Sequence, residues 1–217
     1  MKLLGELSAR DYGIVVFSPD LFNEYVKINK WKAKKLITFF NKDKDKFLQI
    51  IKDGILVPFY LIPSYEYNIF LKVNKVDKEM PKGYKNIYQY NNFYIEIGKN
   101  NKLCIASFAF LENNVDLIRQ NITEKSETIP SGPNEIMEQY NFAFGFELDA
   151  GKYNFNLIGL EKEDIGERES KNFGYLLEFM KNENAKNDNF NKCDNDKNEF
   201  SIIKHLPTID KYGIRKK

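Results

Sequence analysis

Residues 142–159 read FAFGFELDAGKYNFNLIG, and this stretch decides the predicted fold. Large apolar side chains occupy alternate positions on both sides of the link DAGK, residues 149–152. Such alternation turns one face of a strand toward the core and the other toward solvent. Gly151 can adopt the positive φ that a short β-hairpin needs. We therefore interpret the stretch as a hairpin of two strands, with an aromatic face that belongs to the hydrophobic core and not to a cofactor site.

Other segments on both sides of this stretch also have strand-like patterns. Pro58 lies inside one of them and indicates an edge strand or a bulge. Residues 127–135 (ETIPSGPNE) carry two prolines around a glycine, which is typical of a loop. Residues 182–198 are polar and nearly free of apolar side chains, so we expect a mobile loop there. The segments expected to be strands are 12–17, 55–62, 65–73, 92–97, 102–110, 174–181 and 199–206.

The segment from about residue 19 to 53 is predicted to be helical. Ser18 and Pro19 suit the N-cap and the first position of a helix. A second helix is expected over about 43–53, where Gly54 supplies a left-handed stop. The pattern predicts one α+β domain over residues 1–217, mainly an antiparallel β-sandwich or open sheet over about 55–206. An N-terminal helical pair would pack on this sheet.

The composition limits the class of protein. The 217 residues are 42% hydrophobic, which is enough for one substantial core. The net charge of only +2 argues against a dedicated nucleic-acid binder, which normally has a strongly basic face. We expect no signal peptide and no membrane insertion, and two cysteines do not make a disulfide framework, so a cytoplasmic location is expected. Cys104 lies in an apolar run and should be buried, whereas the polar surroundings of Cys193 predict exposure.

No pattern of catalytic residues stands out in the sequence. The single histidine, His205, excludes a site built from several histidines, and no orienting carboxylate or nucleophile turn lies near it. No glycine-rich phosphate loop precedes a helix. We therefore expect a protein that is not an enzyme, with no catalytic residues, no metal and no cofactor. Carboxylate pairs such as Glu147 and Asp149 keep a carboxylate-using hydrolase open as an alternative.

Two strongly charged segments are candidates for binding a partner. Residues 27–46 hold eight lysines and two aspartates, and this basic segment could grip phosphates or an acidic protein surface. Residues 161–170 (EKEDIGERES) are acidic and could mimic nucleic acid in a basic cleft. An ordinary solvated surface is the alternative for both. The candidate partner-binding residues are Glu161, Glu163, Asp164, Glu167 and Glu169 in the acidic segment, and Lys30, Trp31 and Lys34 in the basic one.

The pattern FGFELDAGKYNFNLIG, residues 144–159, resembles the closing hairpin of the competence-nuclease inhibitor family and small β-sandwich immunity proteins of bacterial toxin systems. The resemblance implies a protein that binds another protein. We expect an immunity-type or antitoxin-type inhibitor that occludes a partner toxin or nuclease. Two alternatives stay open. One is a carboxylate-using hydrolase or carbohydrate-binding β-sandwich, with Trp31 stacked on a sugar ring. The other is a nucleic-acid-associated accessory protein that uses the lysine-rich helix.

Overall fold

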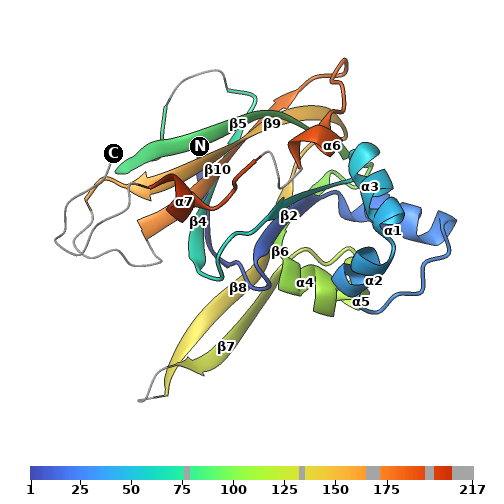
Figure 1. Ribbon diagram of the computed structural model, residues 1–217, viewed down its shortest axis with the longest axis horizontal. Helices are drawn as coiled ribbons and strands as arrows, with labels where there is room; N and C mark the ends of the chain where they lie inside the picture. The colour runs from blue at the N-terminus through green and yellow to red at the C-terminus, as the bar shows by residue number, and fades with distance from the viewer. Residues whose placement is uncertain (76–78, 132–134, 165–171, 194–197, 207–217) are drawn as a thin grey trace.

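The computed structural model describes residues 1–75, 79–131, 135–164, 172–193 and 198–206 (Figure 1). Its strands are β1 (Lys2–Ser8), β2 (Gly13–Phe17), β3 (Leu56–Tyr60), β4 (Glu66–Val73), β5 (Tyr84–Ile97), β6 (Lys102–Ser107), β7 (Lys125–Ser131), β8 (Ile136–Glu147), β9 (Gly151–Lys162) and β10 (Phe173–Lys181). Its helices are α1 (Pro19–Ile28), α2 (Leu36–Lys42), α3 (Lys44–Lys52), α4 (Phe108–Asn113), α5 (Val115–Arg119), α6 (Asn189–Lys192) and α7 (Ile202–His205).

The strands form one mixed sheet that curls into a nearly closed barrel (Figure 1). Hydrogen-bonded neighbours follow the order β3-β2-β6-β8-β1-β4-β10-β9-β5, and β7 pairs with β8 beside this path. Most pairs are antiparallel, but β1 with β8 and β4 with β10 run parallel. The α+β class is as expected, whereas the antiparallel sandwich or open sheet is wrong. A sheet that curls on itself leaves fewer exposed edges than an open one.

The two end strands of the order, β3 and β5, meet along a seam. The backbone N–H of Glu96 in β5 donates to the carbonyl oxygen of Gly54, which lies just before β3, over 2.8 Å. Beside this bond the buried side chain of Asn189 pairs with the backbone of Tyr94. Its Nδ2 donates to the Tyr94 carbonyl oxygen at 2.6 Å, and its Oδ1 accepts from the Tyr94 N–H at 2.7 Å. A side-chain amide thus satisfies backbone groups that a neighbouring strand would otherwise pair.

Residues 142–159 do not form a hairpin, so that prediction is wrong. Strands β8 and β9 follow one another in the chain, but β8 pairs with β6, β7 and β1, whereas β9 pairs with β5 and β10. The alternating rows do face the core as predicted. Phe144 and Phe146 are half-buried against it, and the buried members are Phe142, Leu148, Tyr153, Phe155 and Leu157. Alternation determines which face of a strand is buried, but it carries no information about which strand lies beside it.

Three short helices replace the expected N-terminal pair. Helix α1 ends in a Schellman motif, in which the Trp31 N–H donates to the Val26 carbonyl oxygen at 3.0 Å and the Lys30 N–H donates to that of Lys27 at 3.1 Å. Lys30 has a φ of 54°, the left-handed conformation that this motif requires. The chain therefore turns at Lys30, and α2 and α3 follow as separate short helices.

Three local predictions are also wrong. Residues 127–135 were expected to be a loop, but residues up to Ser131 belong to β7, which tolerates Pro130 because its only described strand partner is β8. Residues 199–206 hold the short helix α7 in place of a strand. Cys193 is buried, although its sequence neighbours are polar, because the chain around α6 packs on α3 and β5. The same packing places α6 inside the expected loop 182–198.

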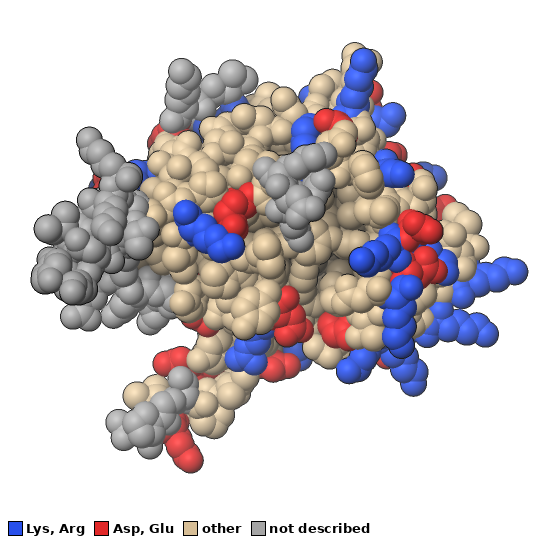
Figure 2. Space-filling view, in the orientation of Figure 1, with Lys and Arg blue, Asp and Glu red and all other residues tan. Residues whose placement is uncertain are grey.

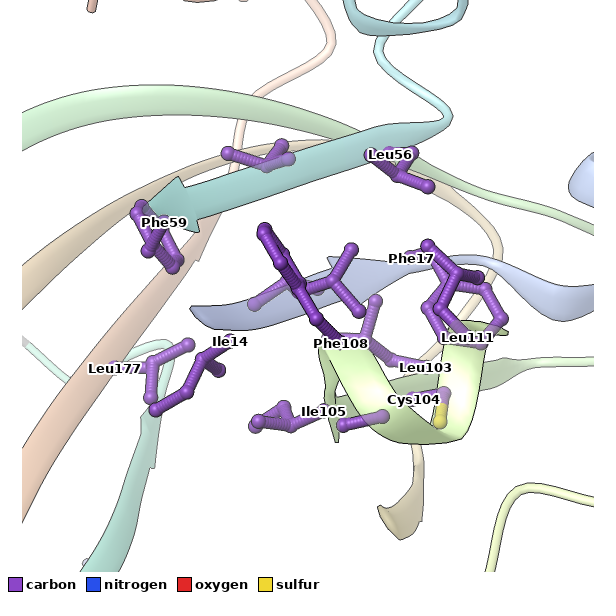
Figure 3. Close-up of a cluster of buried hydrophobic side chains, with 14 of the residues drawn as sticks. Ile14, Phe17, Leu56, Phe59, Leu103, Cys104, Ile105, Phe108, Leu111 and Leu177 are labelled. Carbon is purple, nitrogen blue, oxygen red and sulfur yellow. The ribbon is translucent and has the colours of Figure 1, made fainter. Parts of the chain in front are cut away.

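A cluster of apolar side chains from the barrel and from helix α4 shows how the helices attach to the sheet (Figure 3). Helix α4 starts directly after β6, where the Ser107 hydroxyl accepts from the Phe110 N–H at 3.2 Å and caps the helix. This sharp change of direction lays α4 against the strands. The labelled residues, all buried, are Ile14, Phe17, Leu56, Phe59, Leu103, Cys104, Ile105, Phe108, Leu111 and Leu177.

Candidate protein-binding surfaces

The acidic segment is only partly available to a partner. Glu161 lies in β9 with 1% of its side chain exposed, and its Oε2 is 2.9 Å from the Lys85 ammonium nitrogen. Glu163 and Asp164 are exposed at the end of the described part of the segment. Glu167 and Glu169 lie outside the described residues. The proposed role of this segment in binding therefore stays a prediction.

The basic segment divides into exposed lysines and a buried tryptophan. Lys30 and Lys34 are exposed, whereas Trp31 is only 7% exposed. The Schellman motif directs Trp31 back over its own helix, where its ring packs edge-on against Tyr25 with centroids 5.3 Å apart. Phe39 and Phe40 lie 5.1 Å and 5.7 Å from it on the other side. Trp31 therefore joins α1 to α2, and its ring is not an exposed stacking platform.

Two of the three candidate residues of the basic segment come together in a cavity of about 490 Å³. Lys30 and Trp31 line it, and Lys34 does not. Local sequence patterns give no sign of Arg119, because α5 is brought beside α1 only by the tertiary fold. The full lining is Asn23, Val26, Lys27, Lys30, Trp31, Lys32 and Arg119.

The most protruding element is a two-stranded extension of the sheet, which we call the β7–β8 arm (residues 126–131 and 135–140; Figure 1). Ser126–Ser131 of β7 pair with residues 136–141 of β8 in antiparallel register. Strand β8 enters the barrel only from Asn141 onward, through β1 and β6. Among the described residues, the arm strands thus pair with each other and with no further strand.

The arm exposes apolar side chains that a folded protein usually covers. Ile136 is 61% and Met137 59% exposed, and they point to opposite faces because successive strand residues alternate. Ile136 pairs with Ser131, and Met137 pairs with Pro130. The described arm residues include three glutamates, Glu127, Glu135 and Glu138, and no lysine or arginine. The arm therefore combines apolar contact area with negative charge.

The base of the arm is fixed to the barrel. The Arg10 guanidinium carbon lies 5.2 Å from the centre of the Tyr140 ring and 5.1 Å from that of Phe142, within the range of cation–π attraction. Tyr140 donates its hydroxyl hydrogen to Glu138 Oε2 over 2.7 Å. The Arg10 contacts hold the direction in which the arm leaves the barrel, whereas the bond between Tyr140 and Glu138 lies within the arm.

The sequence held a signal for this arm. Residues 125–140 place the four-residue stretch GPNE (132–135) between two segments that each contain isoleucine. A pair of strands joined through a short Gly-containing segment is a β-hairpin pattern. The prolines at 130 and 133 favoured a loop in the sequence analysis and concealed the pattern.

The helical end of the molecule is the more basic one. Lys and Arg side chains gather over the helices at the right of Figure 2, with several Asp and Glu side chains among them, while Asp and Glu side chains lie along the arm at lower left. Such separation gives the two ends different electrostatic potentials, so each attracts a different kind of partner.

The lone histidine serves the packing of the C-terminal segment. The His205 ring lies 4.4 Å from the Tyr88 ring, and its Nε2 is 2.7 Å from the Glu199 carbonyl oxygen. In the described part of the chain, no three His, Cys, Asp or Glu side chains gather as a metal site. No helix within the described ranges is long and apolar enough to span a bilayer.

Comparison with known proteins gives a weak structural resemblance. No protein-family model matches the sequence, and no curated protein matches it significantly. One similar structure is ComJ from Bacillus subtilis, an inhibitor of the DNA-degrading activity of NucA, with a TM-score of 0.40 and 11% identity over 84% of this chain and 100% of ComJ. Another is the crocagin biosynthetic gene J product, with a TM-score of 0.40 and 10% identity over 83% of this chain and 94% of that one. The structural neighbours thus include a nuclease inhibitor, at a level of similarity too low to transfer a function.

Proposed function

We propose that this chain binds another protein and inhibits it by placing the β7–β8 arm in a cleft of that partner. The observation that carries the proposal is the arm itself, with Ile136 and Met137 exposed at the start of β8. A binding role of this kind involves no bond-making step by this chain.

The stability of the arm supports a role in binding. A two-stranded hairpin alone is only marginally stable in water, because it buries little apolar surface. The arm has the barrel for support only at its base, near Tyr140 and Asn141. A partner that covers Ile136 and Met137 would supply the missing apolar burial. Exposed apolar side chains surrounded by polar ones are typical of protein-binding sites.

The charge of the arm defines the chemistry of the partner. Glu127, Glu135 and Glu138 make the arm negative, so a cleft that receives it should be lined with lysine and arginine. Enzymes that act on nucleic acid have such clefts, because their substrate is a polyanion. We therefore propose a partner that cleaves nucleic acid, with the arm occupying the path of the substrate.

The test uses the partner that the tagged chain captures from cells in which it is naturally expressed, beginning with the product of the adjacent gene. The partner is assayed for hydrolysis of DNA and RNA with and without the chain. We expect hydrolysis to stop when this chain is added in stoichiometric amount. The variant I136D/M137D should bind at least about 30-fold more weakly, the effect of losing an interface hot spot of about 2 kcal/mol.

Leu61→Asp is the matched control, because Leu61 is 52% exposed, lies away from the arm in sequence, and has a positive φ that aspartate tolerates. It should inhibit as the unmodified chain does. Charge reversal by E127K/E138K should slow association, most clearly at low salt. Inhibition that survives I136D/M137D, or a captured partner whose hydrolysis continues in the complex, contradicts the proposal.

A further inference from the structure

The cavity beside Trp31 has features that protein binding by the arm does not use. It lies between helix α1, the turn that follows α1, and the end of helix α5. Its volume of about 490 Å³ falls within the range of small-molecule sites in proteins. The floor includes the apolar side chains of Val26 and Trp31, as such sites usually do.

The charged residues that line the cavity are all basic. Three lysines and one arginine line it, and none of the seven lining residues is acidic. Arg119 is held in place from two sides, since its Nη1 lies 3.1 Å from Asp116 Oδ1 and its Nη2 donates to the Ala33 carbonyl oxygen at 3.1 Å. The lysines are exposed and can reach a bound anion. A guanidinium and several ammonium groups around a concave surface suit a phosphate.

Two buried polar atoms belong to side chains that line this cavity. Asn23 donates from Nδ2 to the Ile118 carbonyl oxygen at 2.7 Å and to Asn121 Oδ1 at 2.8 Å, but its Oδ1 has no partner within the described residues. The indole Nε1 of Trp31 likewise has none there. Both residues are only 7% exposed. Buried polar atoms nearly always have hydrogen-bond partners, so a missing donor or acceptor requires an explanation.

We infer that the cavity binds a nucleoside monophosphate. The phosphate would be held by Lys27, Lys30, Lys32 and Arg119, and the apolar part of the ligand would contact the small parts of Val26 and Trp31 that remain exposed in the cavity. Asn23 Oδ1 and Trp31 Nε1 are closed to solvent, so a ligand reaches them only when the side chains around them shift. The edge of a nucleobase offers both the donor and the acceptor that these two atoms would then need. Inorganic phosphate would satisfy the cations but would leave the apolar floor and the Asn23 acceptor unused.

The position of Trp31 makes the site easy to observe. The chain has a single tryptophan, so its fluorescence reports on this cavity alone. The ring contacts Tyr25, Phe39 and Phe40, and a ligand beside it changes the polarity around the indole. Red-edge excitation avoids absorption by the nucleotide, and isothermal calorimetry on the full chain gives an independent affinity.

The experiment titrates the full chain with AMP, UMP, inorganic phosphate, adenosine and a short single-stranded oligonucleotide that lacks a terminal phosphate. We expect a saturable change in Trp31 fluorescence with at least one of the two monophosphates, and an affinity at least about tenfold above those of phosphate and adenosine. Lys30→Gln should weaken binding by about tenfold or more, because a charge-assisted hydrogen bond is lost.

Lys34→Gln is the matched control, since Lys34 belongs to the same basic segment and is exposed but does not line the cavity. It should leave the affinity unchanged. Several results would overturn the inference: no binding of either monophosphate, equal affinity for inorganic phosphate, tighter binding of the oligonucleotide, or equal losses in the Lys30 and Lys34 variants. The arm does not line this cavity, so a negative result in the nucleotide titration does not affect the inhibition test. That test compares the unmodified chain with I136D/M137D and is read on its own.

Discussion

Lys30 occupies a backbone position that usually belongs to glycine. Its φ of 54° closes the Schellman motif at the end of α1, and a residue with a Cβ atom pays about 1–2 kcal/mol for that conformation. Glycine avoids this strain but loses about 0.5–1 kcal/mol through the greater freedom of its unfolded chain. Lys30→Gly should therefore raise the free energy of unfolding by about 0.5–1 kcal/mol in urea denaturation. The same variant should bind the monophosphate less tightly than the unmodified chain.

Lys34→Gly provides the comparison, because Lys34 does not have a positive φ. Glycine relieves no strain there, so this variant should only lose stability through the greater freedom of its unfolded chain. A Lys30→Gly protein that is less stable than the unmodified chain would contradict the assignment of the helix stop. The opposite signs expected for stability and for binding would indicate that Lys30 is kept for its charge, as residues at functional sites often are.

Asn189 replaces a strand at the barrel seam with a single side chain. Asn189→Ala leaves the N–H and carbonyl oxygen of Tyr94 without their partner in a buried place. Each such group costs about 1–3 kcal/mol, so we expect the two together to lower the free energy of unfolding by about 2–6 kcal/mol. Asn184 is an exposed asparagine of the same segment. In urea denaturation, the free energy of unfolding of Asn184→Ala should differ from that of the unmodified chain by less than about 0.5 kcal/mol. Equal stabilities of the two variants would exclude this role of Asn189.

Cys193 should be chemically inert in the folded protein. Burial raises the pKa of its thiol well above the usual value, and the thiolate is the reactive form. Since the folded state favours the neutral thiol, stability from this group is complete below the usual thiol pKa of about 8.5 and declines as the pH rises above that value. A disulfide reagent at pH 8 should label Cys193 at least about tenfold more slowly than after unfolding. Rapid labelling of the native chain would contradict the burial.

At the scale of elements, local signals located most strands but not their neighbours. The alternation in residues 142–157 correctly indicated an inward row of aromatic side chains. Strand β8 nevertheless forms hydrogen bonds with β6 and β1, whereas β9 forms them with β5 and β10. The two strands are therefore not neighbours in the sheet. Pairing depends on the whole sheet, because the same alternation fits any neighbour with an apolar face.

The β7–β8 arm should open more easily than the barrel strands. Its backbone hydrogen bonds are covered by only one neighbouring strand, and few buried apolar contacts oppose local unfolding. Hydrogen exchange followed by mass spectrometry should show peptides of residues 126–131 and 136–140 exchanging at least about tenfold faster than those of β2 and β6. Binding of the proposed partner should slow hydrogen exchange in the arm and leave the exchange rates of the barrel strands unchanged. Equally slow exchange of arm and barrel in the free chain would contradict this description.

At the scale of the whole molecule, the helical end and the barrel should unfold together. Trp31 fluorescence reports on the helices, whereas pulsed hydrogen exchange of β2 and β6 peptides in the same urea series reports on the strands. Because one continuous core includes side chains of both, we expect the two urea transitions to coincide. This result would also test the prediction of a single domain over residues 1–217. Midpoints that differ between the two probes would indicate two separately stable parts.

The sequence by itself determined the α+β class, the positions of most strands, the burial of the aromatic rows and the basic nature of residues 27–46. These properties are local, because periodicity, capping residues and charge are read within a few neighbouring positions. Only the tertiary structure decided that the sheet curls into a barrel, that β8 and β9 lie apart, and that Arg119 joins Lys30 and Trp31 in one cavity. Each depends on contacts between residues distant in the chain, which local patterns permit but do not specify.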